Sequence, residues 1–357
     1  MNKLLRNRQN SGITLVALVI TVIILLILAG VAISLVIGDN GLIAKSKESV
    51  EKYKDKAKEE QWQLEDFEAG MEEINLAELK DEEKHPELRQ MKLVLNITED
   101  NKEIQLPVYQ YTYENYTYDC TVQWGDGTTE QVTNENAKTT THTYANTGTY
   151  TVTIEGTYES LYVDWQDESM QKALKKVEQW GATGLKEIYL GNCTNLKEIA
   201  EPSKNSLANV TRVGNAFAGC SNLTSIPERL FANCPNVTSF ESTFLGCSNI
   251  TRLPERLFAN CSNVTSFEST FLGCSNITRL PERLFVNCPN VTSFYATFAN
   301  CTELTGKSIQ LWNEEARHEK GIAENSGGKG CYYMCEKLTD YATIPDFWKQ
   351  WVRYGPQ

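Results

Sequence analysis

Few residues in this chain could take part in catalysis or metal binding. The chain has three histidines, His85, His142 and His318, and eleven cysteines. No histidine belongs to a metal-binding His-Glu-x-x-His motif, and no phosphate-binding Gly-x-x-x-x-Gly-Lys-Ser/Thr loop or Gly-x-Ser-x-Gly nucleophile motif is present. Catalysis needs a nucleophile near a base, or paired carboxylates, in one pocket. We therefore expect no enzyme, no metal site and no cofactor.

The cysteines follow a fixed period instead of forming metal-binding pairs. Two series have a spacing of 27 residues, and they comprise Cys193, Cys220, Cys247, Cys274 and Cys301, with Cys234, Cys261 and Cys288 between them. Zinc sites need short pairs such as Cys-x₂-Cys, which spacings of 13 and 14 do not supply. Disulfides are conceivable in an extracellular chain. We favour a structural cysteine ladder of small buried side chains whose S–H groups donate to loop carbonyls.

The same period organises the surrounding sequence. Two nearly identical units cover 221–247 and 248–274, and each contains Leu/Ile-Pro-Glu-Arg-Leu-Phe-Ala-Asn-Cys followed by Asn-Val-Thr-Ser-Phe-Glu-Ser-Thr-Phe-Leu-Gly-Cys. A fixed repeat of this length is typical of a solenoid. The string resembles a leucine-rich repeat, and more closely the BspA-type repeats of bacterial surface proteins. This resemblance implies a leucine-rich-repeat array over 164–305, with an insertion and a C-terminal cap over 306–357.

Periodicity also separates inward from outward positions of each coil. We expect the inward set of one coil to be Val237, Phe240, Phe244, Cys247, Ile250, Leu253, Leu257 and Cys261. Outward residues of successive coils would form columns, and we predict a candidate ligand face of Arg212, Thr238, Ser239, Glu241, Thr265, Ser266, Glu268, Thr292, Ser293 and Tyr295. Solvated ladders remain the alternative for these columns. As an entry cap, the segment from Asp164 to Gly181 is expected to be one short helix.

A smaller module precedes the array. Alternating segments between turn residues over 91–156 favour a small β-sandwich. Trp124-Gly125-Asp126-Gly127, His142-Thr143-Tyr144 and Gly148-Thr149-Tyr150-Thr151-Val152 together resemble the PKD domain, an immunoglobulin-like module of cell-surface proteins. An acid–base or metal role for Asp126 and His142 is conceivable. We expect them to stabilise a turn, which suits Asp beside Gly.

The N-terminal part carries signals for a membrane. Residues 13–37 are uncharged and, as a helix, would extend about 37 Å, more than the ~30 Å hydrocarbon core. Lys3, Arg6 and Arg8 precede this run, so the positive-inside rule places the rest of the chain, after residue 38, outside the cell. We therefore predict a single-pass transmembrane helix. A heptad stripe from Val50 to Ile74 predicts an amphipathic helical stalk, to which we assign 42–85.

The start of the chain, residues 1–12, is a basic leader ending in Asn10-Ser11-Gly12. This resembles a type IV prepilin leader, which implies cleavage between Gly12 and Ile13 by a prepilin peptidase. The family usually has Glu at the fifth mature position, where this chain has Ala17. That difference argues against a standard pilus subunit. An uncleaved signal anchor remains the alternative.

The expected fold class is therefore multidomain: a transmembrane helix and an amphipathic helix, a small β-sandwich, and a leucine-rich-repeat solenoid with 27-residue coils. The net charge of −12 argues against nucleic acid. We predict a membrane-anchored, non-catalytic protein of the bacterial cell surface, with extracellular C-terminal domains that bind or adhere to a protein or glycan ligand. The alternative is a minor pilin or pseudopilin, with pilus subunits as partners.

Overall fold

The computed structural model describes residues 82–111, 113–313 and 327–350 of the chain. The chain divides into two compact units, 1–67 and 68–357, and every described residue belongs to the second. The predicted leader, the transmembrane segment 13–37, nearly all of the stalk and the processing residues Gly12 and Ile13 lie outside the described residues. Within the described ranges no helix has the length and apolar character needed to cross a membrane.

The predicted fold class is wrong. The described residues form mainly mixed β-sheets with few, short helices. They also lack the regular strand of each leucine-rich-repeat coil, because no strand is assigned between β10 (Glu198–Ile199) and the 3-10 helix η4 (Tyr341–Thr343). The chain there forms turns that are joined by isolated bridges.

The largest sheet has six strands in the order β10-β8-β1-β6-β3-β4. The remaining bounds in this sheet are β1 Met91–Ile97, β3 Tyr118–Gln123, β4 Thr129–Thr133, β6 Gly148–Tyr158 and β8 Leu174–Gln179. Central strand β1 pairs antiparallel with β6 and β8, whereas β10 pairs parallel with β8. Alternate residues of β1 are buried, as expected for a strand with one face on the core. The sheet thus continues past 156, the predicted end of the sandwich.

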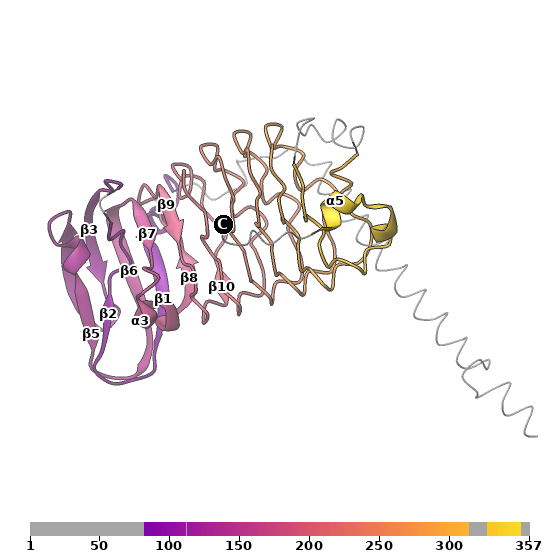
Figure 1. Ribbon diagram of the computed structural model, residues 1–357. Helices are drawn as coiled ribbons and strands as arrows, with labels where there is room; N and C mark the ends of the chain where they lie inside the picture. The colour runs from indigo at the N-terminus through magenta and orange to yellow at the C-terminus, as the bar shows by residue number, and fades with distance from the viewer. Residues whose placement is uncertain (1–81, 112, 314–326, 351–357) are drawn as a thin grey trace, which may run out of the picture. The chain divides into compact units, whose positions relative to one another are not determined.

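Two small sheets and two short α-helices complete the regular structure of the described residues. Antiparallel β2 (Lys102–Gln105) and β5 (Thr141–Tyr144) form one sheet, and parallel β7 (Ser160–Tyr162) and β9 (Glu187–Tyr189) form the other. The helices are α3 (Glu168–Ala173) and α5 (Asp346–Lys349), with 3-10 turns η2 (Pro86–Arg89) and η3 (Ala137–Thr139). Figure 1 shows β7 and β9 beside the six-stranded sheet, at its border with the turns.

The helix predicted from Asp164 to Gly181 is mostly absent. The Asp167 carboxylate caps α3 by accepting the backbone N–H of Met170 at 3.0 Å, and the helix ends at Ala173. Strand β8 begins at the next residue, because its backbone pairs with β1 on one side and β10 on the other. Leu174 and Val177 are buried in that sheet, so their three-residue spacing reflects a strand with bulged pairing.

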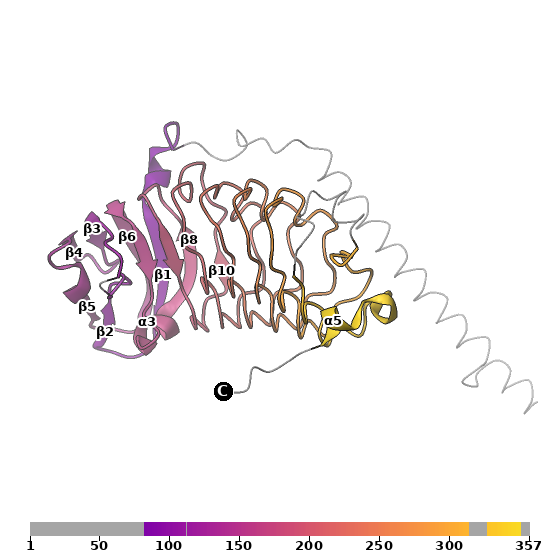
Figure 2. The same cartoon turned by 45° about the horizontal axis from the view of Figure 1, so that its top comes forward.

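After β10, successive turns of the chain stack with the period of the sequence. The amide of Phe240 donates to the carbonyl of Ser266 at 2.9 Å, and the amide of Phe267 donates to Ser293 at 2.9 Å. Figures 1 and 2 show these turns side by side between β10 and α5. The eight residues that we expected inward are all buried. Stacked rings continue the core, with centroids of Phe217 and Phe244 5.4 Å apart.

The stack is closed at its C-terminal end by aromatic side chains. Tyr332 stacks on Phe298 with ring centroids 5.8 Å apart, and Trp312 meets Tyr332 edge to face. Trp348 in α5 is buried and lies against Gly328, where an added Cβ would come within 1.8 Å of the indole ring. This cap therefore depends on a glycine.

Candidate ligand-binding face

The outward columns lie on one face of the stack. Ser239, Ser266 and Ser293 are joined in sequence by parallel bridges, which places equivalent residues of successive coils side by side. Each serine hydroxyl accepts the amide of the residue two positions later, as Ser239 does from Glu241 at 3.1 Å. The hydroxyls of Thr265 and Thr292 donate to the carbonyl of the preceding coil at 3.1 Å. Much of the predicted face is therefore already engaged in holding the coils together.

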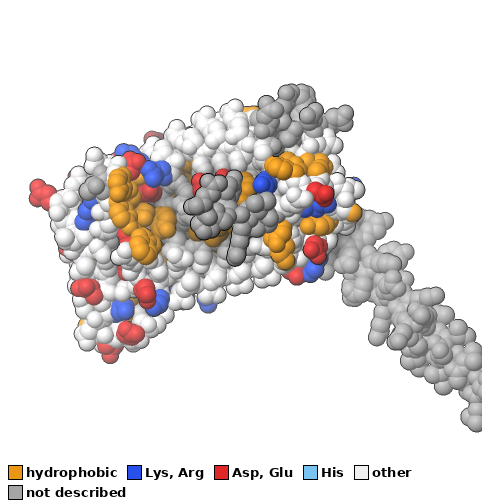
Figure 3. All heavy atoms as spheres, viewed as in Figure 1, with side chains coloured by type: hydrophobic (Ala, Val, Ile, Leu, Met, Phe, Trp, Pro, Cys, Tyr) orange, Lys and Arg blue, Asp and Glu red, His pale blue; other side chains and the backbone are white. Residues whose placement is uncertain are grey.

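A cavity of about 490 Å³, the tyrosine hollow, lies on this face. Its lining includes five tyrosines, Tyr109, Tyr111, Tyr113, Tyr162 and Tyr189, together with the polar or charged residues Glu187, Thr211, Arg212, Asn215, Thr238, Ser239 and Glu241. Figure 3 shows hydrophobic side chains, tyrosine among them, gathered beside charged ones over the part where β7 and β9 lie. Four predicted face residues, Arg212, Thr238, Ser239 and Glu241, thus line the same cavity as a group of tyrosines.

The tyrosines form a connected set of rings. Tyr162 in β7 stacks on Tyr189 in β9 with centroids 4.6 Å apart. Tyr111, from the segment between β2 and β3, meets Tyr162 edge to face at 6.1 Å and stacks with Tyr113 at 6.4 Å. Such pairs hold ring orientation by their quadrupoles. Tyr113 is 85 % exposed, so the outermost ring of the set is open to solvent.

A second cavity of about 400 Å³, the terminal hollow, lies further along the same face. It is lined by Glu268, Ser293, Tyr295, Gly327, Lys329 and Phe347. Phe347 is 53 % exposed. The predicted face is therefore not uniform. Four of its ten residues line the tyrosine hollow and three line the terminal hollow, whereas Thr265, Ser266 and Thr292 line neither.

Arg212 does not present a free charge to a ligand. Its Nη1 lies 2.6 Å from Glu114 Oε1, and its Nε lies 3.3 Å from Glu187 Oε1. Glu187 is buried and also accepts the Ser160 hydroxyl at 2.9 Å. The guanidinium therefore links the tyrosine-bearing segment, residues 109–114 between β2 and β3, to the first coils. The outward position of Arg212 in the repeat pattern did not indicate this structural role.

Burial sets the protonation of this region. It raises the pKa of Tyr109, Tyr111 and Tyr189 above the ordinary value, so their phenols stay protonated at neutral pH. Burial, together with the smaller effect of the nearby charge of Glu241, raises the pKa of Glu268. The tyrosine hollow consequently offers neutral phenols beside its hydroxyl, amide and carboxylate groups.

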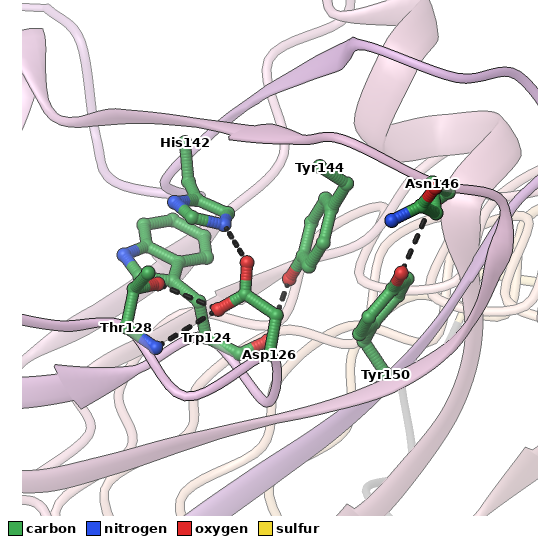
Figure 4. Close-up of polar contacts among 7 residues, drawn as sticks. All are labelled: Trp124, Asp126, Thr128, His142, Tyr144, Asn146 and Tyr150. Carbon is green, nitrogen blue, oxygen red and sulfur yellow. Dashed lines mark hydrogen bonds and ion pairs between the residues drawn. The ribbon is translucent and has the colours of Figure 1, made fainter.

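Asp126 and His142 form a compact turn in the sandwich part, as Figure 4 shows. The Asp126 carboxylate accepts the Thr128 amide at 3.0 Å and the Thr128 hydroxyl at 2.6 Å, and its other oxygen lies 2.8 Å from His142 Nε2. The imidazole stacks on Trp124 at 4.8 Å. Burial would raise the pKa of Asp126, but the Thr128 and His142 hydrogen bonds outweigh it and lower the pKa to about 2.

All eleven cysteines are free and buried. In seven of the eight ladder cysteines the thiol lies within hydrogen-bond reach of a carbonyl in the preceding turns, as Cys247 does at 3.1 Å from Phe217. Burial raises the pKa of Cys220 and Cys274 to about 12. No group of three or more His, Cys, Asp or Glu residues is placed to hold a metal ion in the part of the chain that the structure describes.

The tyrosines of the hollow were missed by sequence reasoning. Two signals could have found them. Tyr109, Tyr111 and Tyr113 alternate in a segment without a strand, and Tyr162 and Tyr189 are 27 residues apart, the period of the repeats. In the structure this second spacing is the register of β7 on β9.

Comparison with known proteins found no matching family model, no matching curated protein and no matching solved structure. The resemblances to prepilin leaders, PKD domains and BspA-type repeats therefore stay predictions.

Proposed function

We propose that this chain is a non-catalytic binding protein of the cell surface, and that its ligand lies along the face that carries the tyrosine hollow and the terminal hollow. The observation that supports this most is the tyrosine hollow, where rings from β7, β9 and the β2–β3 segment line one cavity together with hydroxyl, amide and carboxylate groups. Its volume lies within the ~300–1,000 Å³ typical of ligand pockets.

The chemistry of the hollow suits recognition more than reaction. Tyrosine is enriched at binding hot spots, and antibody binding loops combine it with serine and asparagine, because tyrosine supplies rigid amphipathic area and the small polar side chains supply adaptable hydrogen bonds. The cysteines are buried, and the His142–Asp126 pair holds a turn in another part of the fold. Placement at the cell surface rests on the charge-free run 13–37 with its basic leader, and a membrane anchor there is part of the proposal.

A binding screen with the full chain tests this function. Immobilised glycans and cell-surface proteins would be probed with the wild type, with a Tyr113→Ala/Tyr295→Ala double variant, and with Met334→Ala. Met334 is 43 % exposed and lines neither hollow, so it controls for truncating an exposed apolar side chain. We expect binding that the double variant weakens at least about tenfold, a typical effect of losing aromatic anchors. Binding that is equal in all three proteins would contradict this face as the site.

A further inference from the structure

We infer that the ligand of the tyrosine hollow is a neutral oligosaccharide, an inference that rests on the proposed function and narrows it to one class of ligand. A pyranose ring has an apolar C–H face and a rim of hydroxyls. Its binding site therefore needs an open aromatic face beside groups that both donate and accept hydrogen bonds.

The aromatic part of this requirement is met by rings of fixed orientation. Tyr162 and Tyr189 stack at an interplanar angle of 20°, and Tyr111 stands nearly perpendicular to Tyr162 at 83°. The hollow is thus lined by rings in two directions. Because Tyr111 also accepts a hydrogen bond at its hydroxyl from Trp165 Nε1 at 3.0 Å, its ring is held in place before any ligand binds.

The polar part of the hollow lies on one coil, at Thr238, Ser239 and Glu241. The Ser239 oxygen accepts the Glu241 amide, so its own O–H proton remains for a ligand. The Thr238 hydroxyl and the Glu241 carboxylate have no hydrogen-bond or ion-pair partner within the described ranges. These three groups provide two hydroxyls and one strong acceptor within a few residues of chain. A carboxylate that accepts from sugar hydroxyls makes charge-assisted bonds, which are stronger than neutral ones.

The charges of the hollow argue against an anionic ligand. Arg212 is already paired with Glu114 and Glu187, and Glu241 adds a further carboxylate to the lining. Like charges brought together cost free energy, so an anion is disfavoured. A sugar can pair with the two hydroxyls as well as with the carboxylate, whereas a quaternary ammonium group can neither donate to nor accept from the hydroxyls.

The arrangement of the two hollows favours a chain of sugars over a single ring. Neighbouring strands lie about 4.8 Å apart, so Ser239 and Ser293, two bridges apart, are about 10 Å from each other. The terminal hollow at that end again places aromatic side chains, Tyr295 and Phe347, beside Ser293 and Glu268. An extended ligand can therefore contact rings at both ends of its path.

The test uses the full chain and three sets of probes: neutral hexose and N-acetylhexosamine oligomers of one to six units, deglycosylated cell-surface proteins, and choline. Calorimetry with the strongest neutral oligomer would compare the wild type with Tyr113→Ala and Thr238→Val. Thr251→Val is the matched control, because Thr251 is also exposed and its carbonyl also accepts from the next coil, yet it lines neither hollow. We expect at least about tenfold weaker binding for Tyr113→Ala, equivalent to about 1.4 kcal/mol, about threefold or more for Thr238→Val, and less than twofold for Thr251→Val.

The Glu241→Gln variant distinguishes a saccharide ligand from a cationic ligand, because glutamine keeps hydrogen-bonding groups but lacks the negative charge. For a saccharide we expect a moderate loss, and for a cation nearly complete loss. The inference would be overturned if the chain bound choline and Glu241→Gln abolished that binding. It would also be overturned if the chain bound no oligosaccharide but bound deglycosylated protein in a way that the variants of the hollow weaken. Either result would leave the proposed binding function standing. Oligosaccharide binding that Tyr113→Ala and Thr238→Val both leave unchanged would overturn the site.

Discussion

At the scale of single residues, Asp126 shows how a turn depends on ionisation. Its carboxylate accepts two hydrogen bonds from Thr128 and lies beside His142, and the pKa falls to about 2 from the ordinary value of about 3.9. A carboxyl whose pKa is lower in the folded state contributes stability above its unfolded pKa. That contribution must disappear as the pH falls from about 4 through 2.

We therefore expect Asp126→Asn to lower the unfolding midpoint at pH 6, and the difference from wild type to shrink as pH falls towards 2. Tryptophan fluorescence of the full chain during thermal unfolding measures it, since Trp124 stacks on His142 in this turn. Asp119→Asn, at an exposed position of β3, is the control for removing a carboxylate. A difference that stays constant from pH 6 to pH 2 would mean that the charge of Asp126 does not stabilise the turn.

The ladder cysteines make a second prediction at this scale. Cys247 is fully buried, and its thiol lies 3.1 Å from the Phe217 carbonyl. Thiolates are the reactive form, so buried thiols with raised pKa should react slowly. Thiol titration should find few reactive groups in the native full chain and eleven after denaturation without reductant. Cys247→Ala should also cost about 1–3 kcal/mol, because it leaves a cavity. Few new thiols on denaturation would indicate disulfides instead.

At the scale of elements, the C-terminal cap depends on close contact between α5 and a glycine. A Cβ at Gly328 would lie 1.8 Å from a Trp348 ring atom, too close for the indole to stay in place. We expect Gly328→Ala to displace Trp348 and to expose the rings of Tyr332 and Trp312 beneath it. Faster proteolysis near α5 and a red-shifted tryptophan emission would measure this. The neighbouring change Gly327→Ala is the control, because its Cβ would meet only the Thr292 carbonyl at an ordinary 3.7 Å. Equal proteolysis of the two variants would show that the cap adapts.

At the scale of the whole described unit, Arg212 joins the tyrosine-bearing segment to the stacked turns. Arg212→Ala would leave the carboxylate of Glu187 buried without its cation. A buried group that loses its charged partner costs about 1–3 kcal/mol, and we expect the lower part of that range because Arg212 is half exposed. Unfolding of the full chain in urea would measure the loss.

The double variant Arg212→Ala/Glu187→Gln sharpens this test. Glutamine carries no charge and can still accept the Ser160 hydroxyl, so the double variant should regain part of the stability that Arg212→Ala loses. Additive losses in the two single variants and the double variant would show that the two side chains act independently.

Repeat spacing alone was a good guide to which side chains lie inside the stack. The eight inward positions predicted for one coil are buried, because equivalent residues of stacked turns occupy equivalent environments. The same reasoning was wrong about the architecture. Turns that are hydrogen-bonded through isolated bridges bury the same repeated positions without forming a regular strand. In addition, β8 follows α3 directly, although the spacing of its apolar residues fits a helix.

The sequence by itself determined the period of the stack, the cysteine positions and the Asp126 turn, since each depends on residues close in the chain or related by one repeat. Only the tertiary structure decided where a ligand can bind. The tyrosine hollow joins Tyr111 to Glu241, which are far apart in sequence, and it exists because β7 pairs with β9 and Arg212 contacts Glu114. Packing between residues that are far apart in the sequence leaves no local pattern. No spacing along the chain could therefore reveal that aromatic rings lie at one end of the predicted face.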